Sequence, residues 1–201
     1  MQATTPPLRH AWRKLLAAVM EGGDDPDAEL RELRQVTTAF SVEEGDLVDL
    51  STLGLRDTLA EMRKVFFTSE PNRFGHSYRS FWRGPSGRSD LTDIIKLLSE
   101  QPSTKRALLV LVDPNGKHVP CLNALHFLIR HGRLEVGYFA RGQDVYLKFC
   151  ADAICVHELG RKVASQLNLE IGAVTGTISS AHIYRRDFER VAAILNLLPQ
   201  H

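Results

Sequence analysis

The sequence predicts an α+β fold in which helices pack on a mixed, mainly antiparallel sheet. Apolar runs with strand-like composition are interspersed with segments of helical spacing, in no regular βαβ order. Two of the strand candidates are separated only by His131-Gly132, which is typical of a hairpin. The chain has 201 residues, of which 43% are hydrophobic. This length is enough for one compact domain, and we expect residues 1–201 to form it.

The first half of the chain is predicted to hold two helices and one strand. Residues 1–10 are polar and are expected to be loose, whereas residues 11–20 have the pattern of an amphipathic helix. After an acidic, glycine-containing loop, the second half of residues 29–42 is rich in Val, Thr and Phe and predicts a strand. A helix is predicted over residues 56–66 from apolar residues at helical spacing, namely Leu55, Leu59, Met62 and Phe66.

The second half has a clearer pattern. Residues 69–90 are rich in Gly, Ser, Arg and aromatic residues and predict a long functional loop, followed by a helix through Leu98 that Ser89 or Asp90 would cap. A buried strand (107–113) and a turn (113–116) come next. The remaining predicted elements are two hairpin strands (121–130 and 133–141), a helix (152–167), a strand (173–184) and a final helix (187–198).

Charge and cysteine usage exclude several classes of protein. The formal net charge is +1, so no large basic field indicates a nucleic-acid partner. Three cysteines with no CxxC pair fit neither a disulfide framework nor a zinc site, and we expect no metal. They fit a reducing compartment. No apolar run is long enough to span a membrane, so we expect a cytoplasmic protein.

Two short motifs lie at the ends of predicted strands. Cys121 follows Pro120, and a thiolate there can act as a nucleophile if a nearby cation lowers its pKa; the alternative is a buried cysteine that acts as a small apolar residue. Arg141 and Asp144 close the next strand. The arginine can hold a phosphate, or the two residues can form a local salt bridge or turn.

Two further groups of polar residues are candidates for ligand binding. Lys105-Arg106 precedes a buried strand and can clamp a phosphate, although such pairs are usually only solvated. Ser180, His182 and Tyr184 alternate along a strand and therefore share one side of it. That side forms either a polar pocket or an exposed face.

The order of these motifs resembles the superfamily of thymidylate synthases and pyrimidine-nucleotide (CMP or dCMP) hydroxymethylases. The matching segment extends from about Phe74 to Asp187, which is more than half of the chain. It contains, in order, Gly75-x-x-Tyr78 with Trp82-Arg83, Lys105-Arg106, Pro120-Cys121, Arg141-x-x-Asp144 and His182-Ile183-Tyr184.

This resemblance implies one-carbon transfer to C5 of a pyrimidine nucleoside monophosphate. Cys121 would add to C6 of the ring, with Tyr78 near the nucleophile, and 5,10-methylenetetrahydrofolate would supply the one-carbon unit. Asp144 matches the residue that contacts the folate pterin, and Glu61 is the candidate for the family's catalytic glutamate.

The resemblance also implies how the nucleotide is held. Arg141 matches the arginine that binds the phosphate. Lys105 and Arg106 match a pair that reaches the phosphate in the partner subunit, so a homodimer with shared sites is expected. His182 and Tyr184 match the ribose-binding pair, and we group Ser180 with them.

The most informative departure from the synthase pattern is Asp152. Thymidylate synthases have an asparagine there that reads uracil, and cytidylate hydroxymethylases have an aspartate. A carboxyl group can accept from the cytosine amino group and, when protonated, donate to N3. The alternative is that Asp152 only caps the helix that follows.

Other positions depart from the family as well. Gly142 replaces a serine, Ser180 an aspartate and His126 a glutamine, and Lys148 begins a run that is Gly-Leu-Pro-Phe-like in the family. The C-terminal residues 198–201 also differ from the apolar tail that closes the family's folate site.

The sequence therefore predicts hydroxymethylation of CMP or dCMP in nucleotide biosynthesis. A compact thymidylate synthase acting on dUMP is the first alternative. A diverged nucleotide-binding protein without turnover is the second, suggested by Lys148 and by the uncertain position of the catalytic glutamate.

Overall fold

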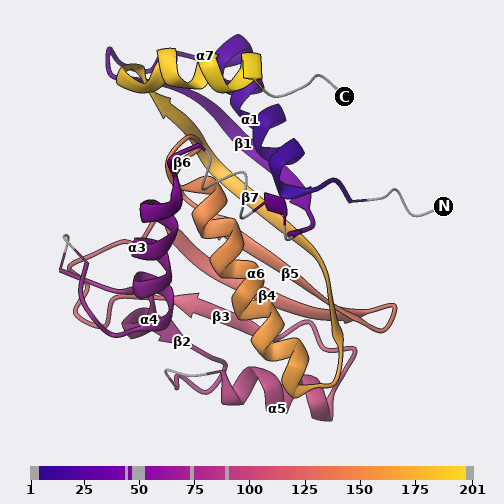
Figure 1. Ribbon diagram of the computed structural model, residues 1–201. Coiled ribbons are helices and arrows are strands. Elements are labelled where there is room, and N and C mark those ends of the chain that lie inside the picture. The colour runs from indigo at the N-terminus through magenta and orange to yellow at the C-terminus, as the bar shows by residue number, and fades with distance from the viewer. Residues whose placement is uncertain (1–4, 44, 47–52, 73–74, 89–90, 198–201) are drawn as a thin grey trace.

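One mixed sheet organises the chain (Figure 1). The computed structural model describes residues 5–43, 45–46, 53–72, 75–88 and 91–197. Its strands are Leu30–Phe40 (β1), Trp82–Arg83 (β2), Leu108–Leu111 (β3), Leu122–Arg130 (β4), Arg133–Ala140 (β5), Gln143–Asp144 (β6) and Glu170–Tyr184 (β7). They follow the order β1-β7-β5-β4-β3-β2, with β6 also beside β7. Between the strands of the described residues, β5 and β6 pair with β7 in parallel and the other pairings are antiparallel, so the predicted α+β class is confirmed.

Helices cover one face of this sheet. They are Leu8–Gly22 (α1), Arg56–Phe67 (α3), Tyr78–Phe81 (α4), Thr92–Glu100 (α5), Phe149–Gln166 (α6) and Phe188–Leu197 (α7), with a 3-10 turn at Arg185–Asp187 (η1). The long helix α6 crosses the middle of the sheet (Figure 1). It packs closely there, because a Cβ placed on Gly160 would lie 2.7 Å from a side-chain carbon of Val136 in β5. Within the part of the chain that the structure describes, no helix is long and apolar enough to cross a membrane.

The N-terminal helix begins earlier than the sequence predicted. Residues 8–10 form its first turn instead of part of a loose terminus, because Leu8 is only 1% exposed and starts the apolar face of α1. Pro7 precedes the helix, where its missing N–H costs no hydrogen bond. Residues 1–4 lie outside the described residues. On the same face, Trp12 donates its indole N–H to the carbonyl of Val145 at 2.7 Å and so ties α1 to the chain just before α6.

Long-range pairing extends two strands beyond their predicted limits. Only the second half of β1 has strand-like composition. The whole of β1 is nevertheless a strand, because it pairs with β7 from Leu30↔Tyr184 to Phe40↔Val174. β7 begins at Glu170 because its first residues pair with β5. By contrast, the hairpin between β4 and β5 is local and was predicted correctly. His131 and Gly132 both have positive φ, at 50° and 74°, as its two-residue turn requires.

The segment 69–90 is less irregular than predicted. It contains α4, whose cap is Ser77, and the short strand β2, which pairs with β3. Ser89 and Asp90, the predicted caps of α5, lie outside the described residues. The helix predicted from residue 152 begins at Phe149, because Phe149, Cys150 and Ala151 are buried and extend its apolar face.

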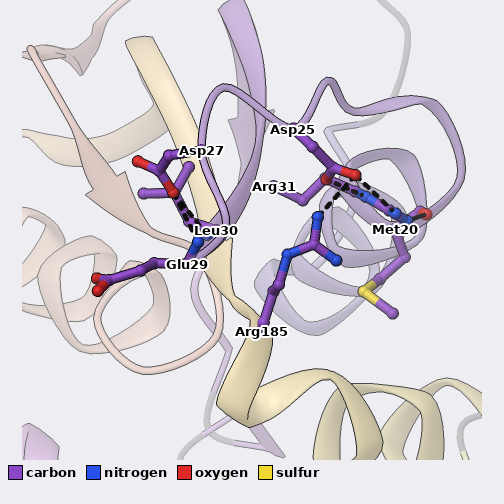
Figure 2. A network of polar contacts seen from close by, with 7 residues as sticks. All are labelled: Met20, Asp25, Asp27, Glu29, Leu30, Arg31 and Arg185. Atoms are coloured by element: carbon purple, nitrogen blue, oxygen red, sulfur yellow. Dashed lines mark hydrogen bonds and ion pairs between the residues drawn. The ribbon is translucent and has the colours of Figure 1, made fainter.

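Polar contacts hold the loop between α1 and β1 against the end of β7 (Figure 2). The carboxylate of Asp25 pairs with Arg31 of β1 at 2.9 Å and with Arg185 of η1 at 2.7 Å. Arg31 also donates to the carbonyl of Met20 at 2.6 Å, and Asp27 accepts the backbone N–H groups of Glu29 and Leu30. This network fixes the place where β7 leaves the sheet, next to the site described below.

Candidate functional site

A pocket of about 520 Å³ opens where α3, α4, the start of α6 and the end of β7 meet. Eight of the residues that the sequence predicted for the site line it: Glu61, Tyr78, Cys121, Arg141, Asp144, Asp152, His182 and Tyr184. They come from segments as far apart in the sequence as α3 and β7. Because the sheet and α6 bring these segments together, the fold unites most of the predicted site.

Three predicted residues lie outside this pocket. Lys105 and Arg106 are exposed before β3, where Arg106 donates to the side-chain carbonyl of Gln101 at 2.8 Å. Within this chain they are therefore solvated. Ser180 is half-buried on β7 and donates to Glu32 of β1 at 2.5 Å, so its hydroxyl is used in strand-to-strand contact.

Cys121 is the one exposed cysteine, whereas Cys150 and Cys155 are buried in α6. The interpretation of Cys121 as a buried apolar residue is therefore wrong. Partial burial raises the pKa of the Cys121 thiol, while the positive charges of Arg141 and Lys148 act in the opposite direction. The cations that a nucleophilic cysteine needs are thus in place. In the free protein, burial raises the pKa of the thiol more than these cations lower it.

Arg141 is tied to the segment that carries the cysteine. Its backbone N–H donates to the carbonyl of Cys121 at 2.9 Å. Its side chain donates to the carbonyls of Pro120 and Val119 at 3.1 and 2.9 Å. The alternative of a salt bridge to Asp144 is not what the structure has. These bonds hold the guanidinium beside the thiol at the pocket wall.

Tyr78 lies on α4 with its ring packed edge-on against Phe66 at 5.1 Å between centroids. Burial raises the pKa of its phenol, and Asp152 and Cys121 raise it further, whereas the backbone N–H groups of Leu122 and Cys121 lower it. Tyr78 is therefore a neutral hydroxyl at ordinary pH, held against the backbone of the nucleophile.

Asp152 projects from the first turn of α6 into a buried environment and is 4% exposed. Its Oδ2 accepts from the amide of Gln143 at 3.0 Å, while Oδ1 is buried without a hydrogen-bond partner among the described residues. Burial raises the pKa of Asp152 to about 7. The helix-cap interpretation is wrong, because the N-cap is Lys148 and Asp152 lies four residues further on.

Asp144 and His182 lie opposite each other in the paired strands β6 and β7. Asp144 Oδ1 accepts the backbone N–H of Leu147 at 2.9 Å, which is the turn anticipated as an alternative role. Burial raises the pKa of Asp144, and His182 partly offsets this. The His182 ring meets Tyr184 edge-on at 5.4 Å, so the predicted one-sided pair on β7 faces the pocket.

Lys148 brings a cation into the pocket, where it donates to Glu61 Oε2 at 3.2 Å. Glu61 belongs to α3, and Lys148 immediately precedes α6, so this ion pair joins the two helices across the pocket. The pair places the candidate glutamate in the same cavity as Cys121.

Sequence reasoning missed several pocket residues. Gln143 is 3% exposed and bonds Asp152, and Arg186 lies with its guanidinium 4.5 Å from the ring centroid of Tyr184. Gln143 lies within the Arg141-x-x-Asp144 motif, which was the available signal, although it follows the predicted strand 133–141. Arg186 follows the His182-x-Tyr184 motif by two residues, but nothing in the sequence distinguished it from Arg185.

Comparison with known proteins supports a single family. The family model described as "Thymidylate synthase" matches residues 51–201. A protein of Methanothermobacter thermautotrophicus and one of Methanosarcina barkeri, each named "Putative thymidylate synthase", are 24% and 26% identical to this chain. Both matches cover 92% of this chain, and 93% and 90% of those proteins.

A bacterial relative shows a shorter match. The protein named "Thymidylate synthase" of Listeria monocytogenes is 25% identical over 134 residues, which are 64% of this chain and 42% of that protein. The family match covers the cysteine, the pocket arginine and the strand β7, and so includes most of the cavity described above. With fold, pocket and sequence in agreement, the chain belongs to the thymidylate synthase family.

Proposed function

We propose that this protein hydroxymethylates C5 of a cytidylate, CMP or dCMP, through a covalent bond between Cys121 and C6 of the base. Membership of the thymidylate synthase family supports one-carbon transfer to a pyrimidine. The observation that carries the finer proposal is Asp152, a buried carboxyl group at the pocket, one oxygen of which has no hydrogen-bond partner in the part of the chain that the structure describes. Such a group needs a ligand that completes its hydrogen bonds.

Cytosine suits this carboxyl group better than uracil. Cytosine presents an amino donor at N4 and an acceptor at N3, which a protonated carboxyl group satisfies with one acceptor and one donor oxygen. Because the pKa of Asp152 is about 7, a large fraction of the molecules carries the neutral form at neutral pH. Uracil would place its O4 acceptor against a group that is partly a carboxylate, and two acceptors repel each other.

The nucleotide is held by groups around the base site. Arg141 offers a guanidinium next to Cys121 for the phosphate, and His182 and Tyr184 face the pocket where the sugar would lie. Gly142 leaves room there, because a Cβ on it would come no closer than 3.8 Å to His182. The phosphate would bring negative charge beside Arg141, whose guanidinium the carbonyls of Pro120 and Val119 already hold in place.

The reaction requires a nucleophile and a proton path. The Cys121 sulfur would form a bond to C6, which makes C5 nucleophilic toward the one-carbon unit. Loss of the C5 proton would then break the bond between that carbon and the folate nitrogen and release tetrahydrofolate. Water would add to the exocyclic carbon, and the C6–S bond would break to return the thiolate. Glu61, paired with Lys148, supplies a carboxylate in the same cavity for these proton movements. The neutral hydroxyl of Tyr78 lies beside the nucleophile's backbone and can donate or relay a proton.

The donor set fits a folate. Asp144 presents a carboxyl group on the pocket wall, and carboxyl oxygens accept from the ring N–H groups of a pterin. We therefore propose 5,10-methylenetetrahydrofolate as the cofactor; when bound, it supplies a one-carbon unit at the oxidation level of formaldehyde. Residues 198–201, whose match to the family's closing tail is poor, lie outside the described residues.

We also propose a homodimer with shared phosphate sites. Lys105 and Arg106 lie outside the chain's own pocket, so they reach a nucleotide only in a partner subunit. The sheet face opposite α6 carries Leu108 and Phe139, each 40% exposed, which a second copy would cover. Mixing an inactive Cys121→Ala chain with an inactive Lys105→Ala/Arg106→Ala chain is expected to restore activity. Recovery of none would contradict sharing of the site.

Methylation of dUMP is the second candidate, because the relatives are named as thymidylate synthases. The two functions differ in base and in product. A synthase oxidises the folate by hydride transfer to the new methyl group, whereas a hydroxymethylase releases tetrahydrofolate after water adds.

The test is release of tritium from C5. The purified protein is incubated with methylenetetrahydrofolate and 5-tritiated CMP, dCMP, UMP or dUMP, and the products are identified by mass. Release from a cytidylate with a hydroxymethyl product is the expected result and also identifies the sugar. Release from dUMP alone, with dihydrofolate, would assign the synthase reaction. Cys121→Ser must abolish release, whereas Cys155→Ser, a change at a cysteine buried away from the pocket, must retain it.

A further inference from the structure

Asp152 is the end of a chain of three buried polar groups. The hydroxyl of Tyr138 donates to Gln143 Oε1 at 3.3 Å, and Gln143 Nε2 donates to Asp152 Oδ2 at 3.0 Å. The exposed fractions of the three residues are 4%, 3% and 4%. Gln143 and Asp152 line the pocket, whereas Tyr138 supports them from β5. Water therefore has little access to this chain, and each group depends on its neighbour.

The phenol determines which way the amide faces. A buried hydroxyl needs an acceptor for its proton, and Gln143 Oε1 provides it. The amide NH₂ then points to Asp152. If the amide were turned over, the Tyr138 hydroxyl could accept from the amide, but its own proton would lose the acceptor Oε1, and the Asp152 oxygen would face the amide oxygen. Tyr138 therefore orients Gln143, and Gln143 in turn donates to one particular oxygen of Asp152.

A glycine makes this arrangement possible. Tyr138 on β5 lies directly opposite Gly176 on β7 in the parallel ladder. A Cβ on Gly176 would lie 2.4 Å from the Tyr138 hydroxyl oxygen and 2.3 Å from the ring carbon that carries it. No side chain can occupy that space while the phenol stays where it is. The phenol crosses the space above Gly176 to reach Gln143 in β6, which also pairs with β7.

We propose that Tyr138 and Gln143 are positioning residues that make the two oxygens of Asp152 chemically unlike and thereby determine which pyrimidine base the pocket accepts. This inference rests on the proposed function of Asp152 as the base-reading group. Oδ2 already accepts an N–H from Gln143. In a protonated carboxyl group the carbonyl oxygen is a better acceptor than the hydroxyl oxygen, so Oδ2 is favoured as the carbonyl oxygen. The acid proton is therefore held on Oδ1, the oxygen to which none of the residues described in the structure bonds.

Unlike oxygens in a fixed order can discriminate between bases. The order of donor and acceptor on cytosine, N3 acceptor and N4 donor, is the reverse of that on uracil, N3 donor and O4 acceptor. Since the bond from Cys121 to C6 fixes how the base lies, a carboxyl group whose proton stays on one oxygen matches only one of the two edges. Without Gln143 the proton can move to either oxygen, and the carboxyl group can adapt to both bases.

The test measures equilibrium binding, so that it does not depend on turnover. Dissociation constants for CMP, dCMP, UMP and dUMP are determined by calorimetry for the wild-type protein, Gln143→Leu and Tyr138→Phe. Tyr146→Phe is the matched control, because it removes the hydroxyl of another buried tyrosine that does not line the pocket. Circular dichroism and thermal unfolding identify any variant that is not folded.

We expect the ratio of cytidylate to uridylate affinity to fall about tenfold or more in Gln143→Leu, because a hydrogen bond to a buried group is lost. Tyr138→Phe should lower it in the same direction but less, since the amide stays and is only free to turn. Tyr146→Phe should keep the wild-type ratio. A merely structural role would weaken both bases equally and leave the ratio unchanged, and that result in two folded variants would overturn the inference.

The pH dependence of binding provides a second readout. Gln143 donates to the carboxyl group and so lowers the pKa of Asp152, against the larger effect of burial. In Gln143→Leu, the loss of cytidylate affinity with rising pH should therefore move to higher pH. An unchanged midpoint would contradict the role of Gln143. The other charged or titratable groups that act on Asp152 or feel its charge stay in place: Lys148, Asp144, Tyr78, Cys121, Tyr138, Cys150 and Cys155.

The outcome separates this inference from the proposed function. Tritium release decides whether the protein acts on a cytidylate, and it can fail without affecting the binding ratio. If the wild-type protein prefers uridylates, the cytidylate function is wrong. If Gln143→Leu then also loses this preference for uridylates, Gln143 and Tyr138 position Asp152 for uracil instead of cytosine.

Discussion

Lys148 Nζ donates to Glu61 Oε2 across 3.2 Å, and this contact joins residues that are 87 positions apart in the sequence. The ammonium group lies in the same pocket as the Cys121 thiol and contributes a positive charge that lowers its pKa. The side chain of Lys148 is 29% exposed, so its charge is held near the nucleophile but is still hydrated. One residue thus affects both the candidate proton-transfer group and the candidate nucleophile.

Replacing Lys148 with Met should make Cys121 less reactive. Burial already raises the pKa of the thiol, and removal of a cation that opposes this shift raises it further. A higher pKa leaves a smaller thiolate fraction at any pH below it, so we expect alkylation to slow about 3- to 10-fold. The rate of alkylation of Cys121 by iodoacetamide between pH 6 and 9, followed by mass spectrometry, measures this change.

The matched control for that experiment is Lys162→Met. Lys162 also belongs to α6, but its ammonium group lies 4.0 Å from the ring centroid of Phe67 and outside the pocket. It should leave the alkylation profile of Cys121 unchanged. Identical profiles for the two variants would mean that Lys148 has no specific effect on the thiol.

Asp152→Asn should stabilise the protein at pH 8 and much less at pH 4. Burial raises the pKa of Asp152 to about 7 from its ordinary value of 3.8, so the folded state binds more protons than the unfolded state between these values. The contribution of Asp152 to stability therefore decreases as pH rises from about 4 to about 7 and is then constant. Above that window the charged carboxylate costs on the order of 2–4 kcal/mol, a cost that the amide avoids.

Urea unfolding at several pH values measures this difference. Asp113→Asn is an informative comparison, because three backbone N–H groups, those of Asn115, Lys117 and His118, donate to the Asp113 carboxylate and lower its pKa. Its contribution has the opposite sign, present above the unfolded pKa and lost as pH falls. An Asp152→Asn effect that does not vary with pH would contradict the raised pKa.

Gly176→Ala should disturb the base site indirectly, through the side chain of Tyr138. The new Cβ would overlap the phenol of Tyr138, which must move away from Gln143. We expect a loss of about 1–3 kcal/mol in the free energy of unfolding, as is usual for overpacking in a core. The cytidylate-to-uridylate affinity ratio should fall as in Tyr138→Phe.

Gly137→Ala serves as the control for this substitution. Gly137 is the neighbour of Tyr138 in β5, and a Cβ on it would meet nothing closer than 3.9 Å. It should therefore unfold at nearly the wild-type urea concentration. If both glycine variants were equally stable and equally selective, the space above Gly176 would not be required.

Trp12→Phe should destabilise the protein more than Trp82→Phe. The indole N–H of Trp12 donates to the buried carbonyl of Val145 at 2.7 Å, whereas the indole N–H of Trp82 is buried and has no hydrogen-bond partner within the described ranges. The first change leaves an acceptor unsatisfied, at a cost of about 1–3 kcal/mol, and the second removes a donor that was already unsatisfied. Thermal unfolding of the two variants compares them, and equal losses would contradict the importance of the Trp12 bond.

The sequence predicted elements best where the signal is local. The hairpin at His131-Gly132 and the helix over residues 56–66 depend on turn chemistry and on apolar spacing within one segment, and both were correct. The first half of β1 could not be predicted in this way, because its strand conformation comes from pairing with β7, about 150 residues away. Helix α6 begins earlier than predicted because its first residues pack into the tertiary core.

The sequence by itself determined which chemical groups are available: an isolated cysteine after a proline, the arginine and aspartate that follow the next strand, and an aspartate at the head of α6. Those motifs, in that order, were enough to identify the family. Only the tertiary structure decided how they act, because pKa and orientation depend on burial and on neighbours from other segments. It excluded Asp152 as a helix cap and joined Asp152 to Tyr138 through Gln143. It also brought Lys148 to Glu61, a contact between two helices that local patterns do not encode.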